Sequence, residues 1–378
     1  MTKKRTRTRA MDWRIALLLL VLVLIVSFLQ EYEETNAPSP VIGPTATPIA
    51  NQAIIMYTNT AELVYPDVPA DRQMPQFYQA FLADITAATQ SIDIAVFDLD
   101  LPELTEALVA AQQRGVTVRV AFDDENLEDA KVATAIGALE DAGIRVASDQ
   151  REPFMHQKIG VFDNKIVWTG SWNMTFNDTY RNNNNMLRIE NPTMAADYTG
   201  EVDQFMAGDF GTRKTGYAPF ETVTLPDGSL DYYFSPKDKP NALIVAAINQ
   251  AQTQVRFMAF SYTDDAIGQA MIAARERGVS VAGVMERQNV RGTGSEFAIL
   301  EDGGVDILAD GNCYIMHHKT MIIDDDVVIT GSYNFTKSAE QSNDENLLII
   351  RSPQLAAQYL VEYDRVRNQA ENPLTCGR

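Results

Sequence analysis

Two copies of one short pattern hold the side chains of this chain that are best suited to chemistry. In each copy a histidine is followed two residues later by a lysine, then by an aspartate and by Gly-Ser-x-Asn. The chain has only three histidines, and two of them begin these copies. An imidazole can attack phosphorus or transfer a proton, and an ammonium can hold a phosphate, so the pattern predicts phosphoryl transfer. The copies consist of His156, Lys158, Asp163, Ser171 and Asn173, and of His317, Lys319, Asp324, Ser332 and Asn334.

The similarity between the two halves of the chain extends beyond these motifs. Residues 169–175 match residues 330–336 almost position for position, and residues 138–144 match residues 299–305. Self-similarity over this length indicates that one structural unit occurs twice. We therefore expect two homologous lobes that share a single active site at their interface.

The residues around the motifs alternate between helix-like and strand-like patterns. Helical apolar spacing with proline and glycine at the boundaries predicts helices, and short runs rich in β-branched residues predict strands. This alternation predicts an α/β fold in which each lobe has a mostly parallel central sheet flanked by helices. The predicted helices are 74–89, 102–114, 127–142, 242–251 and 265–277, and the predicted strands are 92–97, 116–122, 144–146, 254–260 and 279–285.

Each motif is expected to form a tight hairpin. Residues 158–162 and 319–323 alternate as strands, so each motif histidine and its lysine share one face while His318 points away from the pocket. Asp163 and Asp324 stand at the turns, where an aspartate usually holds the turn instead of contacting substrate. The return strands then bring both Gly-Ser-x-Asn segments to the same edge of the sheet.

The doubled motif resembles that of the phospholipase D superfamily. The resemblance extends from about residue 53 to residue 370, and a doubled motif with this spacing is highly specific. It implies a bilobal α/β phosphodiesterase that needs neither a metal ion nor another cofactor. Residues 334–337 and 343–346 are similar to the small bacterial nuclease branch of the superfamily, and an endonuclease is the alternative function.

The resemblance and the chemistry together imply a two-step phosphohistidine mechanism. One histidine attacks phosphorus while the other protonates the leaving alkoxide and later activates water or an alcohol. Lysine and asparagine side chains hold the non-bridging oxygens, which is the usual task of a divalent metal. Lys158, Lys319, Asn173 and Asn334 are assigned to the phosphate, Asp163 and Asp324 complete the motifs, and Ser171 and Ser332 have supporting positions.

An asymmetry between the halves assigns the two histidines different roles. At an offset of 161 residues, Glu345 corresponds to Asn184. We expect Glu345 to hold the far nitrogen of His317 and Asn184 to orient His156, as the carboxylate of a catalytic triad orients its histidine. A carboxylate favours the protonated imidazole, so His317 is predicted to be the proton donor and His156 the nucleophile.

The composition favours a phospholipid substrate over nucleic acid. Fifty-one acidic and 31 basic side chains give a formal net charge of −20. Such a surface repels polyanions at long range, which disfavours long nucleic acids without excluding an endonuclease. Both motifs lie in one chain, so the protein is predicted to act as a monomer.

The ends of the chain are predicted to lie outside the catalytic lobes. Residues 1–30 combine a basic stretch with an apolar run, which predicts an uncleaved signal anchor with an extracytoplasmic body, or a secreted body if the segment is cleaved. A Pro/Thr-rich linker over 31–52 follows. We place lobe 1 at 53–212, lobe 2 at 213–371 and a tail at 372–378. The two cysteines, Cys313 and Cys376, form either a disulfide or two separate thiols.

Overall fold

The computed structural model describes residues 54–58, 73–216, 220–373 and 375–376. The predicted signal anchor and linker lie outside the described residues. Within the described part of the chain, none of the helices has the length and apolar character needed to cross a bilayer.

The first lobe is built around a seven-stranded sheet with the order β1-β7-β6-β5-β2-β3-β4. The motif hairpin of this lobe begins at Lys158. The helices and strands predicted for this lobe are present, and their bounds differ from the predicted ones by a few residues. Its strands are β1 (Ile54–Thr58), β2 (Ser91–Val96), β3 (Thr117–Asp123), β4 (Arg145–Asp149), β5 (Lys158–Phe162), β6 (Ile166–Gly170) and β7 (Asn185–Glu190). Its helices are α2 (Gln76–Ala87), α3 (Pro102–Gln113), η2 (Asp124–Glu128), α4 (Ala130–Asp141), α5 (Phe176–Tyr180), α6 (Pro192–Met206) and η3 (Gly211–Arg213).

The second lobe repeats this plan around an eight-stranded sheet with the order β12-β11-β10-β13-β14-β15-β9-β8. Its strands are β8 (Val223–Leu225), β9 (Gly228–Ser235), β10 (Gln254–Ala259), β11 (Ser280–Met285), β12 (Asp306–Ala309), β13 (Lys319–Ile323), β14 (Val327–Gly331) and β15 (Glu345–Arg351). Its helices are α7 (Asn241–Gln250), α8 (Asp265–Glu276), α9 (Phe297–Asp302), α10 (Lys337–Gln341) and α11 (Pro353–Glu371).

The α/β fold with two homologous lobes is confirmed, but the expectation of mostly parallel sheets is wrong. Among the strands that the structure describes, only β2–β3–β4 and β10–β11–β12 are parallel, whereas β5, β6 and β7 and their counterparts in the second lobe are antiparallel. Helical crossovers join the parallel strands, and tight turns join the strands of the motif hairpins, which must therefore run antiparallel. Each sheet is mixed because the motif hairpin is inserted beside the βαβ units.

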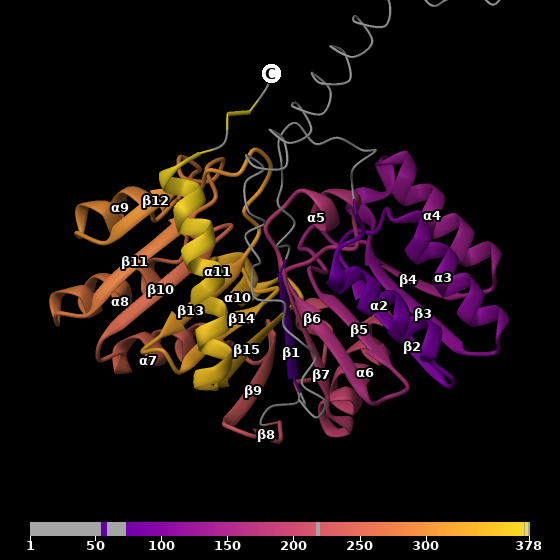
Figure 1. The fold of residues 1–378 in the computed structure, drawn as a ribbon. Coiled ribbons are helices and arrows are strands. Elements are labelled where there is room, and N and C mark those ends of the chain that lie inside the picture. The colour runs from indigo at the N-terminus through magenta and orange to yellow at the C-terminus, as the bar shows by residue number, and fades with distance from the viewer. Residues whose placement is uncertain (1–53, 59–72, 217–219, 374, 377–378) are drawn as a thin grey trace, which may run out of the picture. The chain divides into compact units, whose positions relative to one another are not determined.

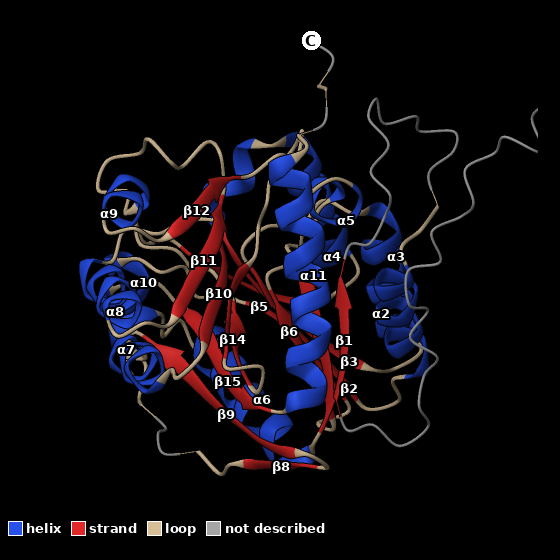
Figure 2. Cartoon of the chain, turned by 60° about the vertical axis from the view of Figure 1, so that its left-hand side comes forward, coloured by secondary structure: helices blue, strands red, loops and turns tan. Residues whose placement is uncertain are grey.

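Helices cover both faces of each sheet (Figure 1). One hydrophobic core contains residues of both sheets and lies between them. On β2, Ile92, Ile94 and Val96 pack against α2, α3 and α4, while Ala95 faces the opposite side. In the second lobe, α7, α8 and α9 pack in the same way against β10 and its neighbours. The central core combines residues of α6, α11 and both sheets, and Figure 2 shows α11 lying against the second sheet. This shared core fixes the two lobes at one interface.

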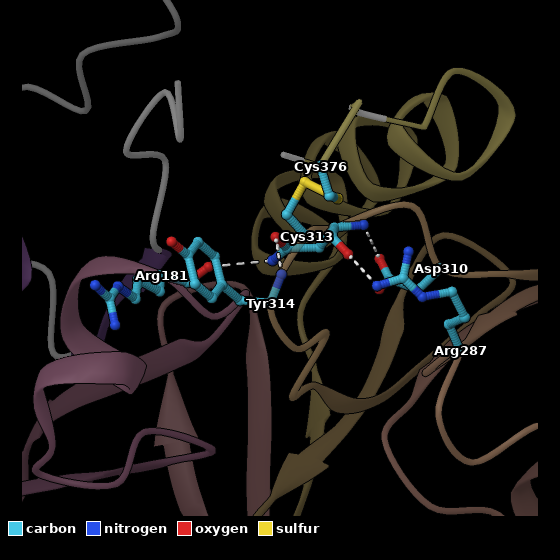
Figure 3. Close-up of a disulfide and its surroundings, with 7 residues drawn as sticks. Arg181, Arg287, Asp310, Cys313, Tyr314 and Cys376 are labelled. Atoms are coloured by element: carbon cyan, nitrogen blue, oxygen red, sulfur yellow. Dashed lines mark hydrogen bonds between the residues drawn. A yellow bond between two sulfur atoms is a disulfide. The ribbon is translucent and has the colours of Figure 1, made fainter. Parts of the chain in front are cut away.

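The cysteines form a disulfide that joins the end of the chain to the loop before the second motif (Figure 3). Cys313 lies between β12 and β13, and Cys376 follows α11 at a sequence separation of 63. The sequence left open whether the two cysteines form a disulfide or two separate thiols, and the structure shows the disulfide. The disulfide fastens the loop that leads to His317.

Breaking this disulfide should destabilise the protein. A crosslink that closes a loop of this length removes conformational entropy from the unfolded chain that corresponds to about 4 kcal/mol. Urea unfolding of the oxidised protein and of Cys376→Ser should show a difference in the free energy of unfolding that approaches this value. Reductant should have no further effect on a Cys313→Ser/Cys376→Ser protein. Equal unfolding midpoints with and without the crosslink would contradict the prediction.

Candidate active site

The two motif histidines lie where the lobes contact each other through their backbones. The backbone N–H of His156 donates to the carbonyl of Asp344 at 2.9 Å, and that of His317 donates to the carbonyl of Asn183 at 2.9 Å. Isolated bridges pair Met155 with Asp344 and Asn183 with Met316. The segment before each histidine is therefore held by the segment before β7 or β15 of the opposite lobe.

Each motif brings an imidazole, an ammonium and an aromatic ring together in the same arrangement. Lys158 Nζ donates to the carbonyl of His156 at 2.8 Å, and Lys319 Nζ donates to that of His317 at 2.8 Å. Phe97 lies 5.1 Å from the His156 ring and 5.3 Å from Lys158 Nζ, measured to ring centroids. Phe260 has the equivalent place beside His317 and Lys319. Both lysines are buried, and each motif histidine is only 6 % exposed.

The partners of the histidines are crossed between the lobes. His156 Nδ1 lies 2.7 Å from Glu345 Oε2, whereas His317 Nδ1 lies 3.0 Å from Asn184 Oδ1. The predicted pairs, Glu345 with His317 and Asn184 with His156, are therefore wrong. The internal repeat correctly aligns Glu345 with Asn184, but alignment says nothing about which lobe a side chain faces. Both residues lie at the lobe interface and reach the histidine on the far side.

Besides Glu345, a second carboxylate, Asp178, lies near the histidines. The sequence did not predict it. Its Oδ2 lies 3.4 Å from His317 Nδ1 and accepts the backbone N–H of Asn173 at 2.7 Å. Asn184 Oδ1 accepts the hydroxyl of Ser171, so this oxygen is a carbonyl acceptor and His317 donates from Nδ1. The only sequence signal for Asp178 is its position three residues after Thr175, which caps α5.

The two Gly-Ser-x-Asn segments have matching contacts. Side-chain Oδ1 atoms of Asn173 and Asn334 are buried, and neither has a hydrogen-bond partner among the described residues. Ser332 Oγ accepts the backbone N–H of Asn346 at 2.9 Å, a structural contact that Ser171 reproduces in lobe 1. A Cβ atom on Gly331 would lie 2.4 Å from the Asn346 carbonyl oxygen, so close backbone packing requires glycine here.

The motif aspartates hold the hairpin turns, and their contacts lie away from the histidines. Asp163 accepts backbone N–H groups at residues 89–91, directly before and at the start of β2. Asp324 accepts the equivalent groups at residues 252–254. These hydrogen bonds lower the pKa of both carboxyls despite partial burial. The aspartates thus have a structural role, as predicted, but they join each hairpin turn to the start of β2 or β10.

His318 points away from the motif histidines, as its position on the strand predicts. Its Nδ1 lies 2.9 Å from Asn185 Nδ2, and its Nε2 lies 2.8 Å from Glu362 Oε1. In the first lobe Gln157 has the corresponding position and accepts from Asn346 at 2.6 Å. This face of each hairpin thus joins the lobes, while the opposite face carries the motif side chains.

The buried cluster favours neutral imidazoles in the free protein. Burial, followed by the charges of Lys158 and Lys319, lowers the pKa of both motif histidines well below the ordinary range. Burial also raises the pKa of Glu345 to about 8 and lowers that of Lys158 to about 8. Burial and the charge of Lys158 lower the pKa of Lys319 strongly. An anionic ligand would be expected to stabilise the charged lysines and the imidazolium form.

The rate with a phosphodiester substrate should fall at alkaline pH. Lys158 loses its proton near pH 8 in the free protein, so kcat/KM should decline as pH rises through about 8. A bound phosphate anion raises the lysine pKa, so kcat at saturating substrate should decline only at higher pH. Lys158→Arg keeps its charge, so a decline that persists in this variant would come from Lys319, whose pKa is also lowered. Initial rates measured across this range check the prediction, and a kcat/KM independent of pH would contradict it.

Comparisons with known proteins agree with this geometry. A family model described as "Cardiolipin synthase, PLD-like domain" matches residues 81–206 and 244–367, which is one match in each lobe. A phospholipase D of Rickettsia typhi is 32% identical over 153 residues, covering 37% of this chain and 75% of the relative. A mitochondrial cardiolipin hydrolase of Xenopus tropicalis is 32% identical over 145 residues, covering 38% of this chain and 68% of the relative.

A solved structure shows the same bilobal fold. The crystal structure of phosphatidylserine synthase from Haemophilus influenzae Rd KW20 aligns with a TM-score of 0.59 at 16% identity, covering 78% of this chain and 84% of that chain. The matches to the family model together span more than half of the chain. The chain therefore belongs to this family, and with it to the phosphodiesterases of the phospholipase D superfamily.

Proposed function

We propose that this protein cleaves the headgroup phosphodiester bond of phospholipids by a metal-independent phosphohistidine mechanism. The observation that carries the proposal is the buried cluster of two imidazoles and two lysines at the lobe interface. Neutral imidazoles can attack an anionic phosphodiester, and the lysines supply the positive charge that a metal ion would otherwise bring. Asn173 and Asn334 are assigned to the non-bridging oxygens.

The crossed contacts remove the argument that made His317 the proton donor, because Glu345 contacts His156 instead. We keep His156 as the nucleophile on a different ground: a carboxylate also stabilises an imidazole that has become positive by bonding to phosphorus. In the reactive state Glu345 is ionised and accepts the Nδ1 proton of His156, so that Nε2 is free to attack phosphorus. Burial raises the pKa of Glu345 to about 8 in the free protein, and the positive charge that develops on the His156 ring favours the ionised form. The new P–N bond forms as the P–O bond to the leaving group breaks, and Glu345 stabilises the resulting positive imidazole.

Binding of the anionic substrate favours the imidazolium form of His317, which takes up a proton at Nε2. His317 keeps its Nδ1 proton beside Asn184 and Asp178 and gives the Nε2 proton to the leaving oxygen. It then removes a proton from water, whose oxygen displaces His156.

The proposed substrate class rests on the net charge of the chain and on its relatives, and the proposed location rests on residues 1–30. The formal net charge of −20 disfavours long polyanions, and the relatives include proteins named phospholipase D and cardiolipin hydrolase. The basic and apolar residues 1–30 would keep the active site next to a bilayer with the lobes outside the cytoplasm. Protease added to intact spheroplasts should then digest the lobes, and full protection would refute this placement.

The proposed function can be tested with the full-length protein in mixed micelles. Phosphatidylcholine, phosphatidylethanolamine, phosphatidylglycerol and cardiolipin should be offered beside single- and double-stranded DNA, each with and without excess EDTA. We expect release of a headgroup from at least one lipid, unaffected by EDTA, and little cleavage of DNA. Cleavage of DNA that weakens steeply with salt, without lipid turnover, would establish the endonuclease alternative. Activity that is lost in EDTA and restored by a divalent ion would overturn the mechanism.

A further inference from the structure

Two buried carboxylates outside both motifs contact the segments that carry the histidines. Asp123 is the last residue of β3, and Glu286 directly follows β11. Each therefore stands at the carboxyl end of the equivalent parallel strand in its lobe. Both are fully buried. Neither belongs to the repeated motif, and the two side chains differ by one methylene group.

The two carboxylates make the same pair of hydrogen bonds. Asp123 Oδ2 accepts the backbone N–H of Met155 at 2.7 Å, and its Oδ1 accepts that of Glu125 at 3.0 Å. Glu286 Oε2 accepts the backbone N–H of Met316 at 2.6 Å, and its Oε1 accepts that of Gln288 at 3.1 Å. Met155 and Met316 are the residues directly before His156 and His317. Each carboxylate thus joins the loop after its own strand to a histidine segment.

The opposite side of each histidine segment is held by the other lobe. Around His156, the Phe154 carbonyl accepts from Asp344 N at 2.8 Å, and His156 N donates to the Asp344 carbonyl. The methionine N–H between these groups points the other way, toward the carboxylate. A segment held on one side only could shift with the partner lobe, whereas a segment held on both sides has a fixed position relative to both lobes.

We propose that Asp123 and Glu286 are positioning residues that fix His156 and His317 through the backbone of the preceding methionine. The proposal rests on the proposed function in assigning a reaction to the histidines, but the contacts themselves do not depend on it. A displacement of about 1 Å in a reacting group can reduce turnover about 100-fold. We therefore expect Asp123→Asn and Glu286→Gln to reduce kcat about 10- to 100-fold.

The amide variants are suitable because a side-chain amide has only one accepting oxygen. Either of these variants keeps the size of the side chain but places an NH2 group against one of the two backbone N–H groups. KM should change much less than kcat, because the lysines and asparagines assigned to the phosphate are retained. Asp93→Asn is the matched control: Asp93 is a buried carboxylate of the same lobe that pairs with Arg119 at 2.7 Å instead of holding a histidine segment.

A second measurement separates positioning from a general loss of stability. The chain has three histidines, so the imidazole NMR signals of histidine-labelled protein can be assigned by single substitutions. Asp123→Asn should shift or broaden the signals of His156 and spare those of His318, and Glu286→Gln should do the same to His317. Asp93→Asn should lower the urea midpoint without these changes.

The two measurements also distinguish this proposal from the proposed function. If the amide variants lose stability as Asp93→Asn does but keep full kcat and unchanged histidine signals, the positioning role is refuted. If the wild-type protein cleaves none of the phosphodiesters offered, the proposed function fails. The NMR signals of His156 and His317 would still decide whether Asp123 and Glu286 position them.

Discussion

Replacing His156 by alanine should abolish the covalent phosphoenzyme, whereas replacing His317 by alanine should trap it. With a natural phospholipid, each substitution should reduce kcat by several orders of magnitude, since no other side chain assigned to the site can replace the nucleophile or the proton donor. A p-nitrophenyl phosphodiester has a good leaving group and needs little protonation. His317→Ala should therefore still form the adduct with this substrate, but should hydrolyse it slowly because no base activates water.

Mass spectrometry of the acid-sensitive adduct, after rapid quenching at alkaline pH, would locate the phosphoryl group. We expect it on His156 in the His317→Ala protein and on no residue in the His156→Ala protein. His318→Ala is a useful control, because His318 faces Asn185 and Glu362. The His318→Ala protein should form the same adduct on His156 as the wild type. An adduct on His317 in the His156→Ala protein would reverse the two roles.

Substitution of Glu345 by glutamine should reduce kcat on the order of 10³- to 10⁴-fold, the scale of loss when an amide replaces a histidine-orienting carboxylate. Glu345 Oε2 lies 2.7 Å from His156 Nδ1. A glutamine oxygen can still accept the Nδ1 proton, but it cannot compensate the positive charge that develops when His156 bonds to phosphorus. The loss should therefore appear in the step that forms the adduct, even with a p-nitrophenyl leaving group.

Stopped-flow release of p-nitrophenol measures adduct formation separately from its hydrolysis. Asn184→Ala is the matched control, because Asn184 contacts His317 at the equivalent position of the repeat. It should leave adduct formation from the activated substrate nearly unchanged and slow the hydrolysis step. If Glu345→Gln instead spares adduct formation and slows only hydrolysis, Glu345 supports the function of His317 despite its contact with His156.

Much of the site could be predicted because its chemistry is local in the sequence. A histidine and a lysine two positions apart on a strand share one face, and an aspartate at a turn usually has a structural role. The first relation places Lys158 beside His156 in the structure. The turn position predicts a structural role for Asp163, but its partners at residues 89–91 are 72 to 74 residues away in the sequence and only the fold brings them together. The repeat added the expectation that the second lobe would do the same, and Lys319 and Asp324 follow it.

Contacts between distant segments were beyond the reach of the same reasoning. The carboxylates Asp123, Asp178 and Glu286 lie outside both motifs, so no spacing linked them to a histidine. Each is close to its histidine segment only because a strand end, a capped turn and a hairpin converge at the interface. The mostly parallel sheet was predicted wrongly for a related reason: helix–strand alternation describes the βαβ units but ignores how the inserted hairpin pairs.

The sequence by itself determined the two α/β lobes, the paired motifs and the faces on which their side chains lie, because periodicity and turn chemistry act over a few residues. The tertiary structure alone decided that Glu345 serves His156 and Asn184 serves His317, that Cys313 meets Cys376, and that both sheets are mixed. An internal repeat identifies equivalent positions within two lobes. Only the packing of one lobe against the other determines which side chains cross the interface.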